Sequence, residues 1–209
     1  MPRLIAFMLA FASCAAGAQD YPAKPIIIVV PAAAGGPTDT LTRVLASAMG
    51  NAMKTQFVIE NAGGAGGIIG INKAAKARAD GYTLLLYHIG MSTAPALYRK
   101  LPYDTLADFE YIGQVADVPT LDEQGLKGFD LFVWNGLFAP KGTPKAAIDK
   151  LVPALQAAVQ DSAFRSRLAE LGAEPVPVAK ATPDSLRTLL KAEVDKWTPI
   201  IRKSGVFAD

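Results

Sequence analysis

The sequence predicts an α/β fold built on a doubly wound, mostly parallel sheet, and three observations support this prediction. Short apolar runs alternate with segments of helical spacing along the first half of the chain. The first run, 25–31 (PIIIVVP), is apolar throughout and rich in β-branched residues, as expected for a strand covered on both faces. Three strand-plus-helix units follow one another, which favours helices on both faces of one sheet.

The N-terminal segment has the three parts of a secretory signal peptide. Arg3 supplies a positive charge, a short apolar run begins at Leu4, and small residues at Ala16 and Ala18 precede a cleavage site. The apolar run is too short to cross a bilayer as a helix. A buried N-terminal helix is the alternative interpretation. We therefore expect residues 1–18 to be removed and the mature protein to lie in the periplasm.

Composition excludes several classes of function. Cys14 is the only cysteine and would leave with the signal peptide, so disulfides and cysteine metal sites are not expected. His88 is the only histidine, so no histidine-clustered metal site is expected either. The formal net charge of +2 gives the chain no overall electrostatic preference for nucleic acid.

The elements of the first half follow from the pattern of apolar residues. Apolar residues recur at helical spacing over 41–52, after a glycine-rich turn. Thr38 is the expected N-cap of this helix, and Asp39 lies in its first turn, where the helix dipole favours a carboxylate. The next elements expected are a strand at 57–60, a helix over about 67–77 and a strand at 82–88.

The second half is mostly helical after two further strands, expected at 111–116 and 131–140. Thr143-Pro144 begins a helix that Pro153 should kink or whose start it should shift. Residues 161–172 should form a capped helix that closes on Gly172. A last long helix is expected from Thr182-Pro183 to a position near Gly205.

The glycine-rich stretch 58–70 (VIENAGGAGGIIG) follows a strand and precedes a helix, as phosphate-binding loops do. It lacks the glycine spacing of a dinucleotide fingerprint, and it ends in GGII where a P-loop needs Gly-Lys-Ser/Thr. No nucleotide and no other cofactor is therefore expected. Backbone N–H groups in such a turn can still bind an anion such as a carboxylate. The alternative is that the glycines only permit tight turns and close packing.

Two glycine-rich turns, one after each of the first two strands, should emerge at the carboxyl edge of a parallel sheet, where ligands bind. His88 ends the third strand at the same edge. A hydrolase built on Ser92 and His88 is a third interpretation, but the chain has no G-x-S-x-G elbow. We expect no catalytic residue and no enzyme activity.

Several segments, in this order along the chain, resemble the Bug family of periplasmic solute-binding receptors of tripartite tricarboxylate transporters. The resemblance implies one lobe of a type II, two-lobed periplasmic-binding-protein fold, with the ligand in a cleft between the lobes. The segments that carry the resemblance are 21–46, 58–70, 79–88, 97–116, 131–144 and the C-terminal part from Trp197 to Ser204-Gly205.

The family's first-lobe ligand contacts lie in the loops after the first two strands, and the end of the third strand borders the same pocket. The resemblance thus implies a small carboxylate ligand, held partly through bridging waters. At position 88 the family usually has a small residue, so the histidine departs from its pattern. The ligand-binding residues implied in this chain are Ala33, Ala34, Gly35, Gly36, Thr38, Asp39, Asn61, Ala65, Gly66, Gly67, His88, Ser92 and Thr93.

Compared with the family that it resembles, the chain is expected to lack the second lobe. Family members build that lobe after the segment matching 112–116, whereas here the chain runs straight on through 117–125. We expect a deletion near 117–120 and a single lobe over 19–209, a length that suits one domain. The partners implied are a small carboxylate and the membrane components of a tripartite transporter, and the exposed lobe face could self-associate. The alternative is a non-binding remnant or a docking module for those membrane components.

Overall fold

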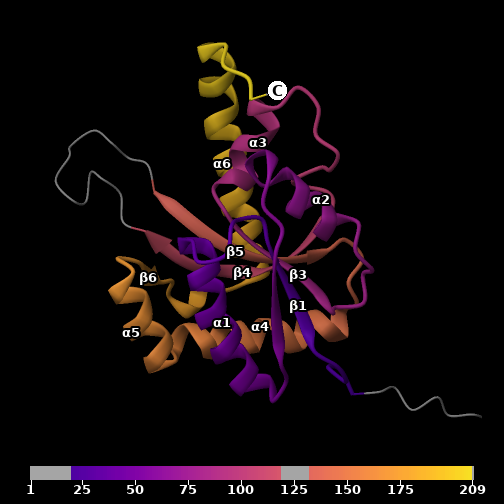
Figure 1. Cartoon of the computed structure of the whole chain (residues 1–209), viewed down its shortest axis with the longest axis vertical. Coiled ribbons are helices and arrows are strands. Elements are labelled where there is room, and N and C mark those ends of the chain that lie inside the picture. The colour runs from indigo at the N-terminus through magenta and orange to yellow at the C-terminus, as the bar shows by residue number, and fades with distance from the viewer. Residues whose placement is uncertain (1–19, 119–131, 209) are drawn as a thin grey trace, which may run out of the picture.

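The structure is a computed structural model that describes residues 20–118 and 132–208. The predicted signal peptide, 1–18, lies outside these residues, as does the second half of the predicted deletion point, 119–120. One six-stranded sheet in the order β2-β1-β3-β5-β4-β6 forms the centre of the lobe (Figure 1).

The strands are β1 (Ile26–Val30), β2 (Phe57–Asn61), β3 (Thr83–His88), β4 (Phe109–Val118), β5 (Val133–Pro140) and β6 (Glu174–Pro175). The α-helices are α1 (Pro37–Met53), α2 (Ile68–Ala75), α3 (Gly90–Leu97), α4 (Lys145–Gln160), α5 (Ser162–Glu170) and α6 (Pro183–Ser204). Two short 3₁₀ turns are η1 (Ala65–Gly67) and η2 (Val178–Lys180).

The sheet is mixed, with one prevailing strand direction. Strand β1 pairs in parallel with β2 and β3, while β5 pairs antiparallel with both β3 and β4. Strand β4 therefore points the same way as the first three strands, and only β5 and the short β6 run against them. The prediction of a mostly parallel α/β sheet is confirmed, because β1, β2, β3 and β4 all run in one direction. The insertion of β5 between β3 and β4 was not predicted.

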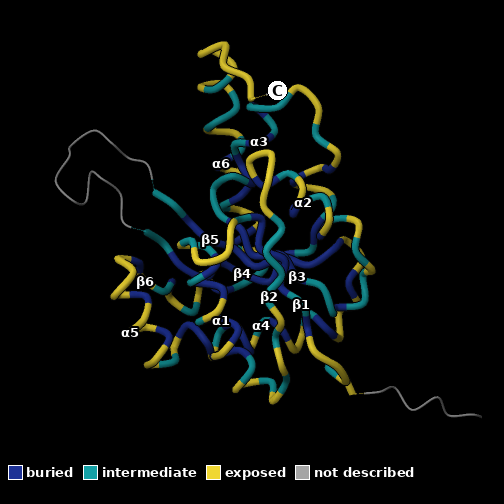
Figure 2. The backbone as a smooth tube through the Cα atoms, in the orientation of Figure 1, coloured by how far each residue is buried: buried dark blue, intermediate teal, exposed yellow. Residues whose placement is uncertain are grey.

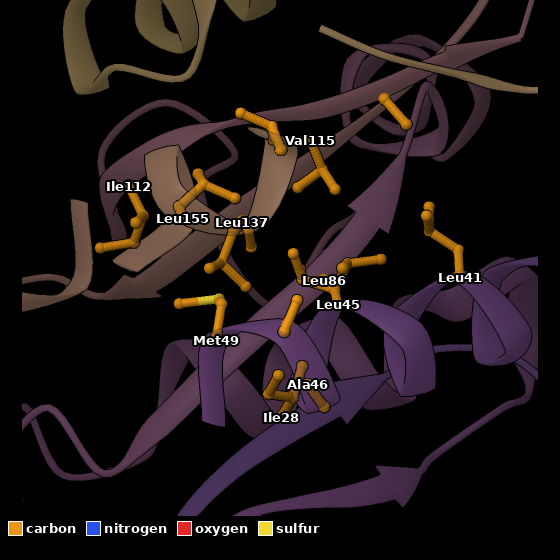
Figure 3. Close-up of a cluster of buried hydrophobic side chains, with 14 of the residues drawn as sticks. Ile28, Leu41, Leu45, Ala46, Met49, Leu86, Ile112, Val115, Leu137 and Leu155 are labelled. Carbon is orange, nitrogen blue, oxygen red and sulfur yellow. The ribbon is translucent and has the colours of Figure 1, made fainter. Parts of the chain in front are cut away.

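Helices cover both faces of the sheet, each over its own apolar core. On one face, α1 and α4 pack on the sheet through side chains that include Leu45, Met49 and Leu155 (Figure 3). On the other face, α2, α3 and α6 cover a second core that contains Trp134 and Phe138. The central strands are buried and the outer turns of the helices are exposed (Figure 2). This three-layer arrangement leaves the carboxyl edge of β1–β4 as the end of the sheet where loops gather.

Most predicted elements are confirmed. For α4 and α6, local sequence signals explain where the helix begins or ends. Helix α6 is capped by Thr182, whose Oγ1 accepts a hydrogen bond from the backbone N–H of Ser185 at 3.3 Å, and it ends at Gly205 with φ 69°. Helix α4 begins directly after Pro144 and continues through Pro153. The proline is exposed, so water can reach the carbonyl group that it leaves without a partner.

The prediction of Thr38 as an N-cap is wrong. Gly36 caps α1, Pro37 occupies the first helical position and Thr38 lies within the helix. Proline favours the first position because its missing N–H has no acceptor there in any case. Asp39 lies in the first turn, as predicted.

Candidate functional site

A pocket of about 290 Å³ opens at the carboxyl edge of the sheet, between the first turns of α1, the ends of β3 and β4 and the beginning of β5. It brings together three residues of the predicted site: Gly35, Thr38 and His88. The other lining residues are Pro37, Thr40, Leu41, Val118, Val133, Asn135, Leu171 and Ala173. A larger and more open hollow of about 660 Å³ beside the edge strand β2 contains none of the predicted site residues.

Asp39 connects the two predicted loops from a position that is only 2% exposed. Its Oδ2 accepts hydrogen bonds from the backbone N–H of Gly35 at 2.7 Å and from Nε of Arg43 at 2.9 Å. Its Oδ1 accepts a hydrogen bond from Nδ2 of Asn61, at the end of β2, at 3.0 Å. The same Nδ2 also donates to the carbonyl oxygen of Ala32 at 3.3 Å. Both carboxylate oxygens of Asp39 and the amide nitrogen of Asn61 thus form hydrogen bonds within the protein.

The charge of Asp39 is fixed by these partners. The hydrogen bond from Arg43 is the main cause that lowers the pKa of Asp39 from 3.8 to about 2, and those from Gly35 and Asn61 act in the same direction. Burial opposes them and is outweighed. Asp39 is therefore a carboxylate at every pH at which a ligand carboxylate would also be charged.

The second loop lies beside the first, as predicted. The N–H of Ala62 donates to the carbonyl oxygen of Val30 at 2.8 Å, at the point where β1 ends. A Cβ atom added at Gly63 would lie 3.5 Å from the carbonyl carbon of Ala32. Both loops emerge at one edge of the sheet because β1 and β2 are parallel neighbours.

The glycines of the second loop are required by two tyrosine side chains. The hydroxyl of Tyr87 donates to the carbonyl oxygen of Gly66 at 2.9 Å, and that of Tyr98 donates to the carbonyl oxygen of Ala65 at 3.3 Å. A Cβ atom at Gly67 would lie 2.3 Å from the Tyr87 hydroxyl oxygen, and the residue has φ 95°. Tight turning and close packing account for these glycines. A ligand contact from Ala65, Gly66 or Gly67 stays a prediction, since none of them lines the pocket.

His88 is held as a neutral imidazole. Its Nδ1 accepts a hydrogen bond from the backbone N–H of Gly90 at 3.1 Å, and its ring stacks on that of Tyr87 with 4.0 Å between centroids. Burial lowers the pKa of His88 below 6.5. Because Nδ1 is an acceptor, the single proton of the neutral ring lies on Nε2. His88 thus offers an N–H donor in the pocket wall.

Ser92 and Thr93 lie in α3 and do not line the pocket. Ser92 is fully buried, and its hydroxyl donates to the carbonyl oxygen of Ile89 at 2.7 Å. Thr93 is half-buried, and its backbone N–H donates to the same carbonyl oxygen at 3.3 Å. A ligand contact from either residue stays a prediction.

Asn135 is a buried polar residue of the pocket that the sequence analysis did not single out. It lies in β5 directly opposite His88 and is 5% exposed. Leu86 and Leu137, two residues along each strand, belong to the core under α1, so His88 and Asn135 face the same side of the sheet. The Asn135 side chain therefore borders the pocket from β5, beside His88. A polar side chain in an otherwise apolar strand was the signal that could have identified it.

Neither a metal-binding cluster nor a membrane-spanning helix is found in the described part of the chain. No group of three or more histidine, cysteine, aspartate or glutamate side chains there is placed to hold a metal ion. Across the same residues, none of the helices combines the length and apolar character needed to cross a membrane.

Comparison with known sequences identifies the family. The model of the tripartite tricarboxylate transporter family receptor matches residues 41–119 and 113–206. A protein of Agrobacterium vitis, the UPF0065 protein in the TAR-I ttuE-ttuC' intergenic region, is 30% identical over 302 residues, which cover 91% of this chain and 87% of that protein. Protein BugT of Bordetella pertussis is 42% identical over 129 residues, and the match spans 57% of this chain and 39% of BugT.

Comparison with solved structures supports the same assignment. The periplasmic binding protein BugD superimposes with a TM-score of 0.84 at 30% identity, covering 90% of this chain and 99% of BugD. MatC (Rpa3494) from Rhodopseudomonas palustris with bound malate superimposes with a TM-score of 0.79 at 23% identity, covering 87% and 100% of the two chains, which shows the shared fold.

These relatives are binding proteins and not enzymes, so the hydrolase interpretation based on Ser92 and His88 is excluded. The chain therefore belongs to the tripartite tricarboxylate transporter receptor family, whose members are periplasmic solute-binding receptors.

Proposed function

We propose that this chain binds a small carboxylate in the pocket between the first turns of α1, the end of β3 and the beginning of β5. The observation that carries the proposal is the pocket itself, in which Gly35, Thr38 and His88 meet the buried amide of Asn135. Two proteins of the same fold, MatC with malate and Rpa4515 of R. palustris with adipate, carry small carboxylates. The volume is near the lower end of the range of about 300–1,000 Å³ for ligand pockets and suits a small molecule.

The N-terminus of α1 supplies the anion site in this proposal. The first N–H groups of a helix have no acceptor within the helix, and the helix dipole favours negative charge there. Thr38 adds a hydroxyl, and Ala33, Ala34 and Gly36 form the adjoining loop. The backbone N–H of Gly35 is not available to the ligand, because it already donates to Asp39. Gly35 therefore contributes mainly to the shape of the pocket.

Asp39 and Asn61 act as positioning residues in this proposal. Their mutual hydrogen bond fixes the loop after β1 against the loop after β2. A direct contact between the Asp39 carboxylate and a ligand carboxylate would place two negative charges together, which is unfavourable. Ala65, Gly66, Gly67 and Thr93 would be reached only by a ligand that extends beyond the pocket. Ser92 is fully buried and would act only by holding the start of α3 through its hydrogen bond to Ile89.

We further propose that the second lobe of the family is missing from this chain. The alignment to the A. vitis protein runs over 302 residues, whereas the chain has 209, so part of that relative has no counterpart here. The two family matches overlap at residues 113–119, beside the predicted deletion near 117–120. The lost lobe would have closed over the ligand, so binding should be weaker than in a two-lobed receptor.

The cellular setting belongs to the same proposal. Residues 1–18 direct the chain to the periplasm, and the receptor delivers its ligand to the membrane components of a tripartite transporter. Self-association through the face that the second lobe would cover is the expected consequence of exposing it.

The proposal is tested by thermal unfolding of residues 19–209 with small mono-, di- and tricarboxylates. A ligand at one hundred times its dissociation constant stabilises the folded state by about 2.7 kcal/mol, which raises the melting temperature visibly. The absence of a shift with every carboxylate at millimolar concentration, in a protein that melts cooperatively, would contradict the proposal and favour the docking module.

Asn135→Asp is expected to weaken carboxylate binding at least tenfold, because it places a negative charge in the pocket wall with almost no change in shape. Asn51→Asp makes the same chemical change at an exposed position of α1 outside the pocket and should leave affinity unchanged. Isothermal titration of both variants against the carboxylate that stabilises the parent chain provides the measurement. Equal affinities of the two variants would place the ligand elsewhere.

A further inference from the structure

We infer that the pocket selects a ligand with one carboxylate and an uncharged polar group at its other end, in preference to di- and tricarboxylates. This inference rests on the proposed function, because it concerns the same pocket, and it narrows the class of ligand. Three features of the pocket lead to it: the helix ends that border it, the charge of its lining and the polar groups of the wall formed by β3 and β5.

The pocket has one end that attracts an anion and one that repels it. The first turns of α1, including Thr38 and Thr40, line one side and present the positive end of that helix. Leu171 and Ala173, which follow the last turn of α5, line the other side. The C-terminus of a helix carries partial negative charge, so a second carboxylate placed there would be unfavourable.

The described lining of the pocket offers no cation to a second negative charge. Among the lining residues that the structure describes, none is lysine or arginine. Arg43 is the nearest arginine in sequence, and its guanidinium is bound to Asp39 outside the pocket lining. His88 is neutral because its Nδ1 accepts the Gly90 N–H and burial opposes its charged form. A second carboxylate, placed away from the N-terminus of α1, would lose its hydration with neither a cation nor a positive helix end to offset the loss.

The wall formed by β3 and β5 suits an uncharged polar group. The Asn135 amide offers one acceptor and two N–H donors, and His88 Nε2–H offers another donor. Asn135 is only 5% exposed and lines the pocket, so a ligand group that both donates and accepts would match both ends of its amide. A hydroxyl or amide group does so, whereas a carboxylate can only accept.

The rest of the lining is apolar and sets the character of the ligand between its two ends. A short hydrocarbon chain would fill this part of the pocket with favourable burial of apolar surface. The side chains that form it are Leu41, Val118, Val133, Leu171 and Ala173.

The test compares glutaramate with glutarate, which share a carbon skeleton and differ by one amide in place of one carboxylate, and adds citrate. Isothermal titration of residues 19–209 at pH 7 should show glutaramate binding at least tenfold more tightly than glutarate, with no binding of citrate. Asn135→Leu, which removes the amide, should reduce the difference between glutaramate and glutarate to less than threefold. Asn51→Leu, on the exposed face of α1, is the matched control and should keep it.

Glutarate or citrate binding as tightly as glutaramate would overturn this inference and leave the proposed function standing. Failure of all three ligands, together with no thermal shift from any other carboxylate, would instead contradict the proposed function itself. The comparison of ligands on the parent chain decides the matter even where the Asn135 variant does not fold.

Discussion

Asp39→Asn is expected to lower the free energy of unfolding by about 2–3 kcal/mol at pH 7. Both carboxylate oxygens accept from donors, namely the backbone N–H of Gly35, Nε of Arg43 and Nδ2 of Asn61. An asparagine presents one oxygen and one NH₂ group, so at least one of these donors would face another donor inside the protein. An unmet buried polar group costs about 1–3 kcal/mol.

The same hydrogen bonds make the contribution of Asp39 to stability depend on pH. The pKa of Asp39 is about 2 in the folded protein against 3.8 ordinarily. Because the folded-state pKa is the lower one, the stabilisation is fully present above about pH 4 to 5 and is lost as the pH falls through about 2. At about 1.4 kcal/mol for each pKa unit, the loss amounts to about 2.5 kcal/mol.

Urea denaturation of the parent chain and of Asp39→Asn between pH 7 and pH 2 measures both quantities. The difference in stability between the two proteins should shrink toward acid pH as Asp39 becomes protonated. Asp149→Asn removes an exposed carboxylate that pairs with Lys145 at i,i+4, and it should change stability by only about 0.5 kcal/mol. A difference for Asp39→Asn that stays constant over the whole pH range would show that the charge of Asp39 contributes nothing.

Gly67→Ala is expected to destabilise the lobe by about 3 kcal/mol. The residue has φ 95°, where a Cβ atom costs about 1–2 kcal/mol. That Cβ would also lie 2.3 Å from the hydroxyl oxygen and 2.7 Å from Cζ of Tyr87, and overpacking of this kind costs about 1–3 kcal/mol. Since the Tyr87 ring stacks on His88, a displaced Tyr87 would also shift the wall of the pocket.

The Gly35→Ala variant separates the backbone cost from the overpacking cost in the destabilisation expected for Gly67→Ala. Gly35 has φ 79°, but no heavy atom lies within 4 Å of an added Cβ, so only the backbone cost of about 1 kcal/mol is expected. Urea denaturation at pH 7 gives the free energy of unfolding of both variants. Tyr87→Phe combined with Gly67→Ala should recover part of the loss, because the hydroxyl is removed. Equal losses for Gly35→Ala and Gly67→Ala would show that Tyr87 does not restrict the loop.

The sequence predicts the elements of this fold well because each one is encoded locally. The apolar run 25–31 indicates a buried strand, and Thr182-Pro183 marks the start of α6 correctly. The position of β5 between β3 and β4 depends on pairing between segments that are distant in sequence, and no local sequence pattern indicates it. For the same reason the hydrogen bond between Asp39 and Asn61, which are 22 residues apart, was not foreseen.

The site was predicted in part. The glycine-rich turn after β1 led to Gly35 and Thr38, and the strand end led to His88, since the carboxyl edge of a parallel sheet is where ligands bind. Asn135 was missed because β5 runs against its neighbours, so the beginning of that strand, not its end, reaches this edge. The rule that ligands bind at the carboxyl ends of parallel strands does not point to the beginning of an antiparallel strand.

The pairing of β4 with β5 makes this edge a natural place for domain insertion. Val118 and Val133 are register partners, so the chain leaves the sheet and re-enters it at adjacent positions, with Cα atoms roughly 4.5–5.5 Å apart. Each doubling of the length inserted between two such fixed points costs only about 0.6 kcal/mol of chain entropy. A complete folded module can therefore be present or absent at this point while the strand register, and with it the lobe, is preserved.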